Sequence, residues 1–377
     1  MATESLFDVL GAPQLCGMIQ GAATGIPNVF PGDPIAKTGF FTLDKTVERD
    51  SGTYTRVYGT RTTAKLAAYG SPSSTRNLRN VESIPVVLMH TVESVSLPMF
   101  NFRGLIRKDA DASNLQIDDQ GIQEITRQVK EFRKNFDNLR VATLTELLAS
   151  GQIFFDGLGN LLPNSTGAVT IASAQIPASN QGQLNALGAG NILDTSWSNP
   201  AADIDRQIQS LRQAAVRLTG YPLKYAFYGK NVPKYLTDNS KISSYLIHNS
   251  AAETAFIGAA DVPNPLFGLT WLPAYEAFFE DANGNLQGLF GDDQVVFTPE
   301  PDREWMGWLE GKYDVPKSVG MVESDAVGQL ASTQVVSGMF AYAIITADPL
   351  TIKMVAGDTF LPVIKVPKAV FQATVNF

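Results

Sequence analysis

Residues 119–151 read DQGIQEITRQVKEFRKNFDNLRVATLTELLASG, and this stretch decides the expected fold. Its apolar residues recur at steps of three and four, the spacing of one helix face: Ile122, Ile125, Val129, Phe132, Phe136, Leu139, Leu144, Leu147 and Leu148. The opposite face is polar, so the helix is expected to lie on a surface: Gln123, Glu124, Arg127, Lys130, Glu131, Lys134 and Asp137. At about 1.5 Å per residue, roughly 30 residues make a rod of about 45 Å. Such a rod suits a shell or scaffold, although an ordinary long helix across a sheet would give the same pattern.

Both ends of this helix carry the residues that helix ends favour. Asp118 or Asp119 can cap the start, and Gly151 follows the last turn as a C′ glycine does. The sequence therefore predicts the bounds of the helix as well as its buried face.

The chain before the helix lacks helical periodicity. Residues 1–44 are rich in glycine and proline and predict an extended arm, with at most one short helix near Leu6 to Leu10. Residues 52–80 alternate Thr, Tyr and Val with charged or small residues around a turn-prone Gly and Ser-Pro segment, which predicts a long two-stranded hairpin. Two strands without a core are marginal in water, so this hairpin is expected to lie on another surface.

The chain after the helix mixes hairpins with shorter helices. Residues 201–218 form a second amphipathic pattern closed by Gly220, and residues 225–228 form a short strand. Helical segments are expected at 231–238 and 241–256, and strands dominate the rest of the chain. Helices and hairpins without regular strand–helix alternation predict an α+β fold.

Composition limits the classes of protein that fit. The chain has 377 residues, so two lobes are expected, and only 18% of them are charged, so much of the surface is expected to contact other protein. Cys16 is the single cysteine, which excludes an internal disulfide and fits a reducing cytoplasm. No apolar run is long enough to span a membrane, and the N-terminus does not read as a signal peptide. The net charge of −8 argues against tight binding of nucleic acid.

Charge is distributed unevenly along the chain. Between residues 49 and 108 nine basic residues stand against three acidic ones, whereas residues 251–330 hold fourteen acidic and three basic residues. Complementary surfaces of this kind can meet within one chain or between copies of it. The residues expected to make contacts between subunits are Arg56, Arg61, Lys65, Arg76 and Arg79 on the basic side, and Asp292, Asp293, Asp302 and Glu304 on the acidic side.

Signals for catalysis are nearly absent. His90, His248 and Cys16 are too few for a usual zinc site, and no nucleophile elbow, phosphate-binding loop or dinucleotide fingerprint occurs. Residues 281–285 resemble the start of a calcium loop but lack the glycine and glutamate it requires, so they predict a hairpin turn between 275–280 and 286–290. No catalytic, cofactor-binding or metal-binding residue is therefore expected, and the protein is not expected to be an enzyme.

Three segments resemble the major capsid proteins of tailed double-stranded DNA bacteriophages, the Hong Kong 97-like fold, and most closely the lambda-type major capsid protein E family. Residues 132–156 (FRKNFDNLRVATLTELLASGQIFFD) are similar to the end of the family's spine helix, with Glu146 and Gly151 at the matching places. Residues 197–200 (WSNP), followed by Asp203 and Asp205 and then by residues 219–220 (TG), resemble the entry into its axial domain. Residues 348–349 (DP), 360–364 (FLPVI) and Pro367 resemble its closing segment.

The resemblance implies a fold and a function. It implies an N-terminal arm at 1–44, an extended loop at 45–85, a peripheral domain at 86–195 and 346–377 with a spine helix near 120–150, and an axial domain at 196–345. It implies a major head protein of the virion, assembled in the host cytoplasm, that forms the hexamers and pentamers of an icosahedral shell around packaged DNA. Expected partners are the chain itself, a portal protein, a scaffold or protease, a decoration protein and, weakly, DNA. Some relatives link this loop covalently through a lysine and an asparagine, but no motif here supports a bond between Lys65 and Asn376.

Two alternatives remain open at this point. A bacterial nanocompartment shell of the same fold would carry a cargo-binding pocket near the N-terminus, of which the arm gives no sign. A soluble hydrolase would need an acidic cleft within residues 250–330, and adjacent carboxylates such as Asp292 and Asp293 rarely point into one site.

Overall fold

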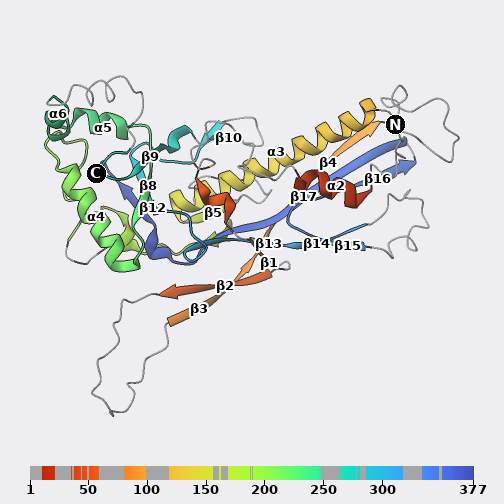
Figure 1. Ribbon diagram of the computed structural model, residues 1–377, viewed down its shortest axis with the longest axis horizontal. Helices are drawn as coiled ribbons and strands as arrows, with labels where there is room; N and C mark the ends of the chain where they lie inside the picture. The colour runs from red at the N-terminus through yellow and green to blue at the C-terminus, as the bar shows by residue number, and fades with distance from the viewer. Residues whose placement is uncertain are drawn as a thin grey trace, which may run out of the picture.

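A long helix lying along a sheet organises the molecule, and a second group of helices and strands packs at one end of that helix (Figure 1). The computed structural model describes residues 11–21, 35, 38–43, 45–48, 51–58, 80–98, 119–155, 161–162, 169–186, 188, 190–247, 262, 265–276, 278–280, 286–316, 333–347 and 350–377. The predicted α+β fold is confirmed.

The main sheet is built around the longest strand, β17 (Leu350–Ile364). One edge of β17 pairs first with β16 (Phe340–Ala347) and then with β13 (Met306–Glu310). Its other edge pairs with β4 (Met89–Pro98), and the short β1 (Lys45–Val47) joins the far side of β13 in parallel. Segments from the start, the middle and the end of the chain therefore meet in one sheet.

The spine helix α3 spans Asp119–Ser150, as its sequence predicts. Gly151 closes it with a φ of 77°, and its amide donates to the Leu147 carbonyl at 3.0 Å. The first half is amphipathic as expected, but residues 141–149 are all buried, because β5, β10 and strands of both sheets pack against the helix. Asp137, expected on the polar face, is also buried, and it accepts a 2.8 Å hydrogen bond from Arg133.

The second sheet has α4 (Ile204–Thr219) packed beside it. Its strands follow the order β7 (Gln181–Gly182), β18 (Phe371–Thr374), β12 (Gln294–Pro299), β8 (Leu223–Tyr228) and β9 (Thr270–Pro273). Asp203 caps the start of α4, and Gly220 ends it with a φ of 86°, so the helix predicted at 201–218 is confirmed. Two short helices, α5 (Val232–Asp238) and α6 (Ser240–Ile247), follow β8, and the rest of the segment predicted at 241–256 lies outside the described residues.

Strand pairing divides the chain differently from the expected domain ranges. The strand β13 falls within 196–345, expected to be axial, and β16 begins there and crosses the boundary at 345, yet both belong to the main sheet with β17. Conversely β18 falls within the range expected to be peripheral but pairs with β12. A run of apolar strand residues shows that a strand forms and says nothing about its partner.

Four two-stranded hairpins complete the described strands. They are β2 (Ser51–Tyr58) with β3 (Asn80–Val87), β5 (Gln152–Phe155) with β6 (Val169–Ser173), β10 (Phe278–Glu280) with β11 (Leu286–Gly288), and β14 (Lys312–Pro316) with β15 (Thr333–Ser337). The hairpin predicted at 275–290 is confirmed. Of the hairpin predicted at 52–80, the first strand forms as β2, but the returning strand β3 begins only at Asn80 and runs on to Val87. Both turns lie outside the described residues.

The N-terminal arm differs from its prediction. A helix, α2 (Ala12–Gly21), forms where only extended chain was expected, and Leu6 to Leu10 lie outside the described residues. Leu15 and Ile19 are fully buried against α3 and the main sheet, so tertiary packing stabilises a helix whose glycine content hides its period. Along the edge of β16, the Cys16 thiol donates to the Ala341 carbonyl at 3.2 Å.

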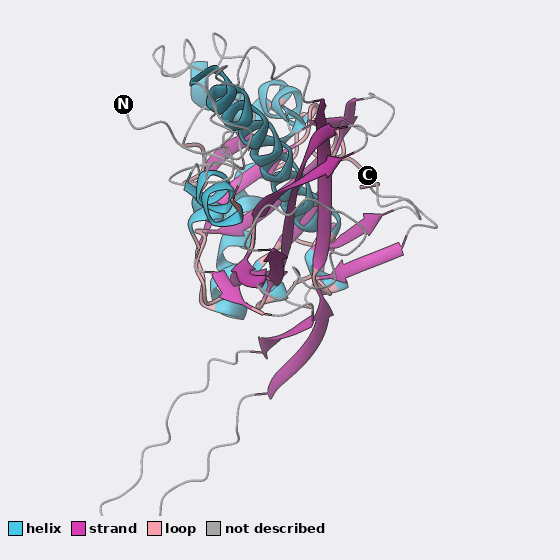
Figure 2. Ribbon diagram, turned by 90° about the vertical axis from the view of Figure 1, so that its right-hand side faces the viewer, coloured by secondary structure: helices cyan, strands magenta, loops and turns pink. Residues whose placement is uncertain are grey.

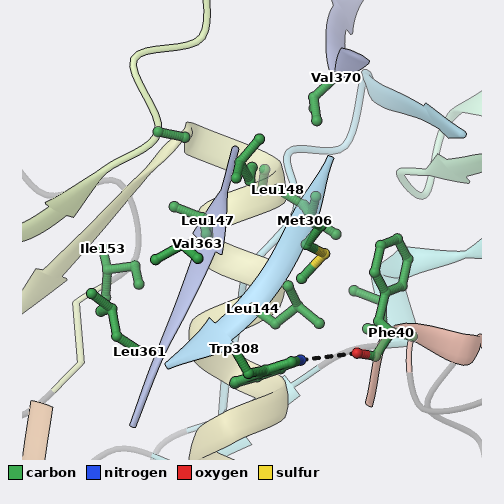
Figure 3. Close-up of a cluster of buried hydrophobic side chains, with 14 of the residues drawn as sticks. Phe40, Leu144, Leu147, Leu148, Ile153, Met306, Trp308, Leu361, Val363 and Val370 are labelled. Carbon is green, nitrogen blue, oxygen red and sulfur yellow. Dashed lines mark hydrogen bonds between the residues drawn. The ribbon is translucent and has the colours of Figure 1, made fainter. Parts of the chain in front are cut away.

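The largest core lies between the C-terminal half of α3 and the main sheet (Figure 3). Leu144, Leu147 and Leu148 of the helix belong to one buried cluster with the strand residues Met306, Trp308, Leu361 and Val363. The indole nitrogen of Trp308 donates to the Phe40 carbonyl at 2.9 Å, which fixes residues 39–42 against this core. The α3 stripe predicted from the sequence is therefore the centre of the fold.

Candidate assembly interface

The hairpin β2–β3 projects from the body of the molecule (Figures 1 and 2). Its strands pair from Ser51↔Val87 to Tyr58↔Asn80, and among the described strands each pairs only with the other. Val87 is 68% exposed, and Thr53, Thr55 and Ser83 are also exposed. The hairpin has no core of its own, as predicted. Residues 59–79, which include Arg61, Lys65, Arg76 and Arg79, lie outside the described residues.

Arg56 is placed differently from its prediction. It was expected to face a neighbouring subunit, but its side chain is fully buried within its own chain. The guanidinium donates to the Tyr54 hydroxyl at 3.0 Å, to the Ala174 carbonyl at 3.2 Å and to Gln175 Oε1. The alternation of β2 gave no sign of this contact, because the partners lie 118 and 119 residues further along the chain.

The acidic residues form two groups at opposite ends of β12. Asp292 and Asp293 precede the strand, and Asp302 and Glu304 follow it. Six strand residues span about 20 Å, so the structure does not bring all four carboxylates together. Asp292, Asp302 and Glu304 are exposed, as a contact surface requires, and Glu304 accepts a 2.9 Å hydrogen bond from the Tyr221 hydroxyl.

Asp293 makes hydrogen bonds within its own chain and is not a free surface charge. It accepts hydrogen bonds from Tyr235 at 2.6 Å, from Asn231 at 2.9 Å and from Asn376 at 3.3 Å. Burial opposes ionisation, but these three donors together lower the pKa of Asp293 below its usual value. Its carboxylate in turn raises the pKa of Tyr235 to about 12. Asp293 therefore joins α5, β12 and the C-terminal residues.

A buried ion cluster that sequence reasoning missed holds the spine helix to the sheet. Arg140 donates two hydrogen bonds to Asp358, at 2.6 and 2.7 Å, and one to Glu310 at 3.1 Å. Its guanidinium also lies 5.0 Å from the centre of the Phe360 ring. Burial works against the charge, yet the two carboxylates raise the pKa of Arg140 above its usual value.

The sequence did contain one signal for this cluster. Arg140 stands four residues after Phe136 and four before Leu144, so it interrupts the apolar stripe of the helix. A charge at a core-facing position needs a buried partner of opposite sign. Sequence spacing could not name Asp358, which is 218 residues away.

The described residues also bear on two further kinds of site, a metal centre and a membrane-spanning helix. They hold no group of three His, Cys, Asp or Glu side chains placed to share an ion, and no described helix is long and apolar enough to cross a bilayer. A groove of about 310 Å³ includes Asp203 and Lys241 in its lining. These two form an ion pair at 2.6 Å, and Asp203 also caps α4, so both have structural roles.

No protein-family model matches the sequence, and no curated protein matches it. A solved structure assigned as the capsid protein of a prophage of Escherichia coli CFT073 matches with a TM-score of 0.50 at 15% identity, over 97% of this chain and 99% of that chain. A phage-related protein from Bordetella bronchiseptica RB50 matches with a TM-score of 0.47 at 11% identity, over 99% and 98%. The mature capsid of bacteriophage PhiM1 matches with a TM-score of 0.43 at 12% identity, over 88% and 84%.

Of these three matches, only the first reaches a TM-score of 0.5. It spans almost the full length of both chains, so the similarity is not confined to one part of the fold. The chain has the α+β fold of the Hong Kong 97-like capsid proteins of tailed phages.

Proposed function

We propose that this protein is the major capsid protein of a tailed bacteriophage and assembles into the hexamers and pentamers of an icosahedral head shell. The observation that carries the proposal is the end-to-end similarity of its fold to a structure assigned as a prophage capsid protein. Many weak contacts, repeated by symmetry, would sum to a stable particle.

The projecting hairpin supports this proposal independently. An isolated pair of strands is marginally stable in water, and Val87 exposes most of its side chain. A neighbouring subunit would supply the surface that the hairpin lacks. The exposed carboxylates of Asp292, Asp302 and Glu304 offer a partner for the basic segment that contains Arg61 and Lys65.

The remaining parts of the proposal follow from this role. Residues 1–44 would be an arm and 45–85 a loop that reaches another subunit, and the two sheets would form the peripheral and axial domains. The protein would be a component of the virion shell, assembled in the host cytoplasm with a portal protein, a scaffold or protease and a decoration protein. The net charge of −8 suits weak contact with DNA, because it leaves packaged DNA free to move over the inner face.

Electron microscopy of the purified chain tests the proposal. Negative-stain images of the protein expressed alone, and together with its neighbouring genes, are expected to show capsomers, tubes or closed shells. A monomer at every concentration and salt condition would contradict the proposal and favour a soluble enzyme. Shells that enclose a co-purified enzyme, and form no particle with DNA, would instead identify a nanocompartment.

A further inference from the structure

The direction of the hairpin β2–β3 depends on contacts at its base, because no other described strand pairs along it. Tyr54 is buried in the main core, and Ile84 and Val86 pack against the same core from the opposite strand. These apolar contacts favour attachment of the hairpin without specifying one angle. Directional hydrogen bonds at the same place would specify it.

Arg56 supplies such bonds. Its guanidinium reaches along its own strand to the Tyr54 hydroxyl at 3.0 Å and across the hairpin to Glu82 at 3.8 Å. It also leaves the hairpin and donates to the Ala174 carbonyl at 3.2 Å and to Gln175 Oε1. A planar group with several fixed donors holds its partners in a defined geometry. Arg56 therefore ties both strands to one point of the body.

The body side of this contact is connected to the spine helix. The Ala174 amide donates to the Gly151 carbonyl at 2.8 Å, and Gly151 is the residue that closes α3. Gln175 has a φ of 50°, in the left-handed region that few residues other than glycine adopt. From this unusual conformation its side-chain oxygen accepts a hydrogen bond from Arg56.

The contacts of Arg56 are not explained by a gain in the stability of the fold alone. Arg56 Nε is buried and meets no acceptor in the described structure, and the carboxylate that pairs with the guanidinium at 3.8 Å, Glu82, is half exposed. Burying a charge with incomplete pairing costs free energy, which an apolar residue at the same position would avoid. Such a group is suited to selecting one orientation among several.

We propose that Arg56 is a positioning residue that fixes the direction in which the hairpin leaves the subunit. The hairpin, the segment 174–175 and the end of α3 then move as one unit. If the chain assembles as proposed above, this direction determines which neighbouring copy the hairpin reaches; that second consequence rests on the proposed function, whereas the first does not.

Electron–electron distance measurements on the free subunit test the first consequence. Spin labels are placed at Ser83 on the hairpin and at Lys130 on α3, both exposed, in a Cys16→Ser background. The parent chain is expected to give a single narrow distance peak. Arg56→Gln should replace it by a broad distribution, and Gln175→Ala should do the same if Arg56→Gln does not fold. Gln175→Glu, which keeps an acceptor for Arg56, should keep the narrow peak.

Thr55→Ala is the matched control, because Thr55 is exposed on the same strand next to Arg56. A distribution that stays narrow in folded Arg56→Gln or Gln175→Ala would overturn the proposal. The labelled protein is measured as a dilute monomer, so the role of Arg56 is tested even in a chain that never assembles. Where the parent assembles, Arg56→Gln is expected to give irregular particles in negative stain, and regular shells would overturn the link to the choice of neighbour.

Discussion

At the scale of single residues, Arg140 shows how one side chain can connect three parts of a fold. It belongs to α3, and its partners Asp358 and Glu310 belong to β17 and β13. All three are buried, so each depends on the others for its charge to be tolerated. The helix is thereby held at one position along the sheet, where apolar contacts alone would allow it to slide.

Removing Arg140 should therefore be costly. Arg140→Met would leave Asp358 and Glu310 buried without their counter-charge, and we expect the free energy of unfolding to fall by about 3–5 kcal/mol. Urea denaturation of the unassembled subunit measures it. Arg127→Met is the control on the same helix, because Arg127 pairs with Glu124 and Glu131 at the exposed surface, and it should leave the midpoint nearly unchanged. Equal effects of the two substitutions would contradict this role of Arg140.

The bond between Tyr235 and Asp293 predicts a pH dependence. Tyr235 has its pKa raised from 10.0 to about 12 in the folded chain, so folding favours the protonated phenol. The corresponding stabilisation is fully present below pH 10 and is lost as the pH rises through about 12. Carbon-13 NMR of the labelled tyrosine rings follows the titration. In Asp293→Asn the pKa of Tyr235 should return toward 10, and an unchanged value would show that the carboxylate is not the cause.

At the scale of elements, two glycines at different places in helices, Gly151 and Gly17, should respond to alanine in opposite directions. Gly151 has a φ of 77°, and an added Cβ would lie 3.2 Å from Ile176 Cδ1. Gly151→Ala should therefore lower the free energy of unfolding by about 1–2 kcal/mol. Gly17 lies inside α2 with open space around it, so Gly17→Ala should raise the free energy of unfolding by about 1 kcal/mol. Thermal unfolding of both variants measures the sign of each change in the free energy of unfolding. A stabilising effect of Gly151→Ala would contradict the assignment of Gly151 as the C′ residue of α3.

Elements with strong local signals could be predicted from the sequence. The apolar period of α3 and the cap residues of α4 are local properties, and both helices form within a few residues of their predicted bounds. The short helix α2 could not be predicted from the sequence. It is stabilised by the packing of Leu15 and Ile19 against a sheet that is distant in the sequence. Pairings such as β18 with β12 were equally hidden, since strand propensity carries no information about the partner.

In the candidate interface, too, features set by neighbouring residues could be predicted, whereas contacts between distant segments could not. The projecting hairpin was predictable because its alternating residues include too few apolar side chains to make a core. The role of Arg56 was not, because its partners Ala174 and Gln175 are brought to it only by the complete fold.

At the scale of the whole molecule, charge complementarity between copies can be tested by reversal. Arg61→Glu combined with Lys65→Glu should block assembly while the subunit stays folded, because like charges would then meet across the interface. Size-exclusion chromatography, circular dichroism and negative stain measure the outcome. Lys230→Glu with Lys234→Glu makes the same change in net charge at two exposed lysines outside the hairpin and should leave assembly intact. Normal particles from the hairpin variant would count against an electrostatic role for it.

The main sheet can form only late in the synthesis of the chain, because its central strand β17 lies near the end of the sequence. The strands β1 and β4 are synthesised early, but their partners β13 and β17 leave the ribosome only when most of the chain has been translated. A nascent chain therefore carries unpaired strand edges until its last segment emerges, and its main sheet cannot close during synthesis. A translation product that ends before β17 would lack the strand to which β4, β13 and β16 pair, so it could not enter a shell that requires this sheet.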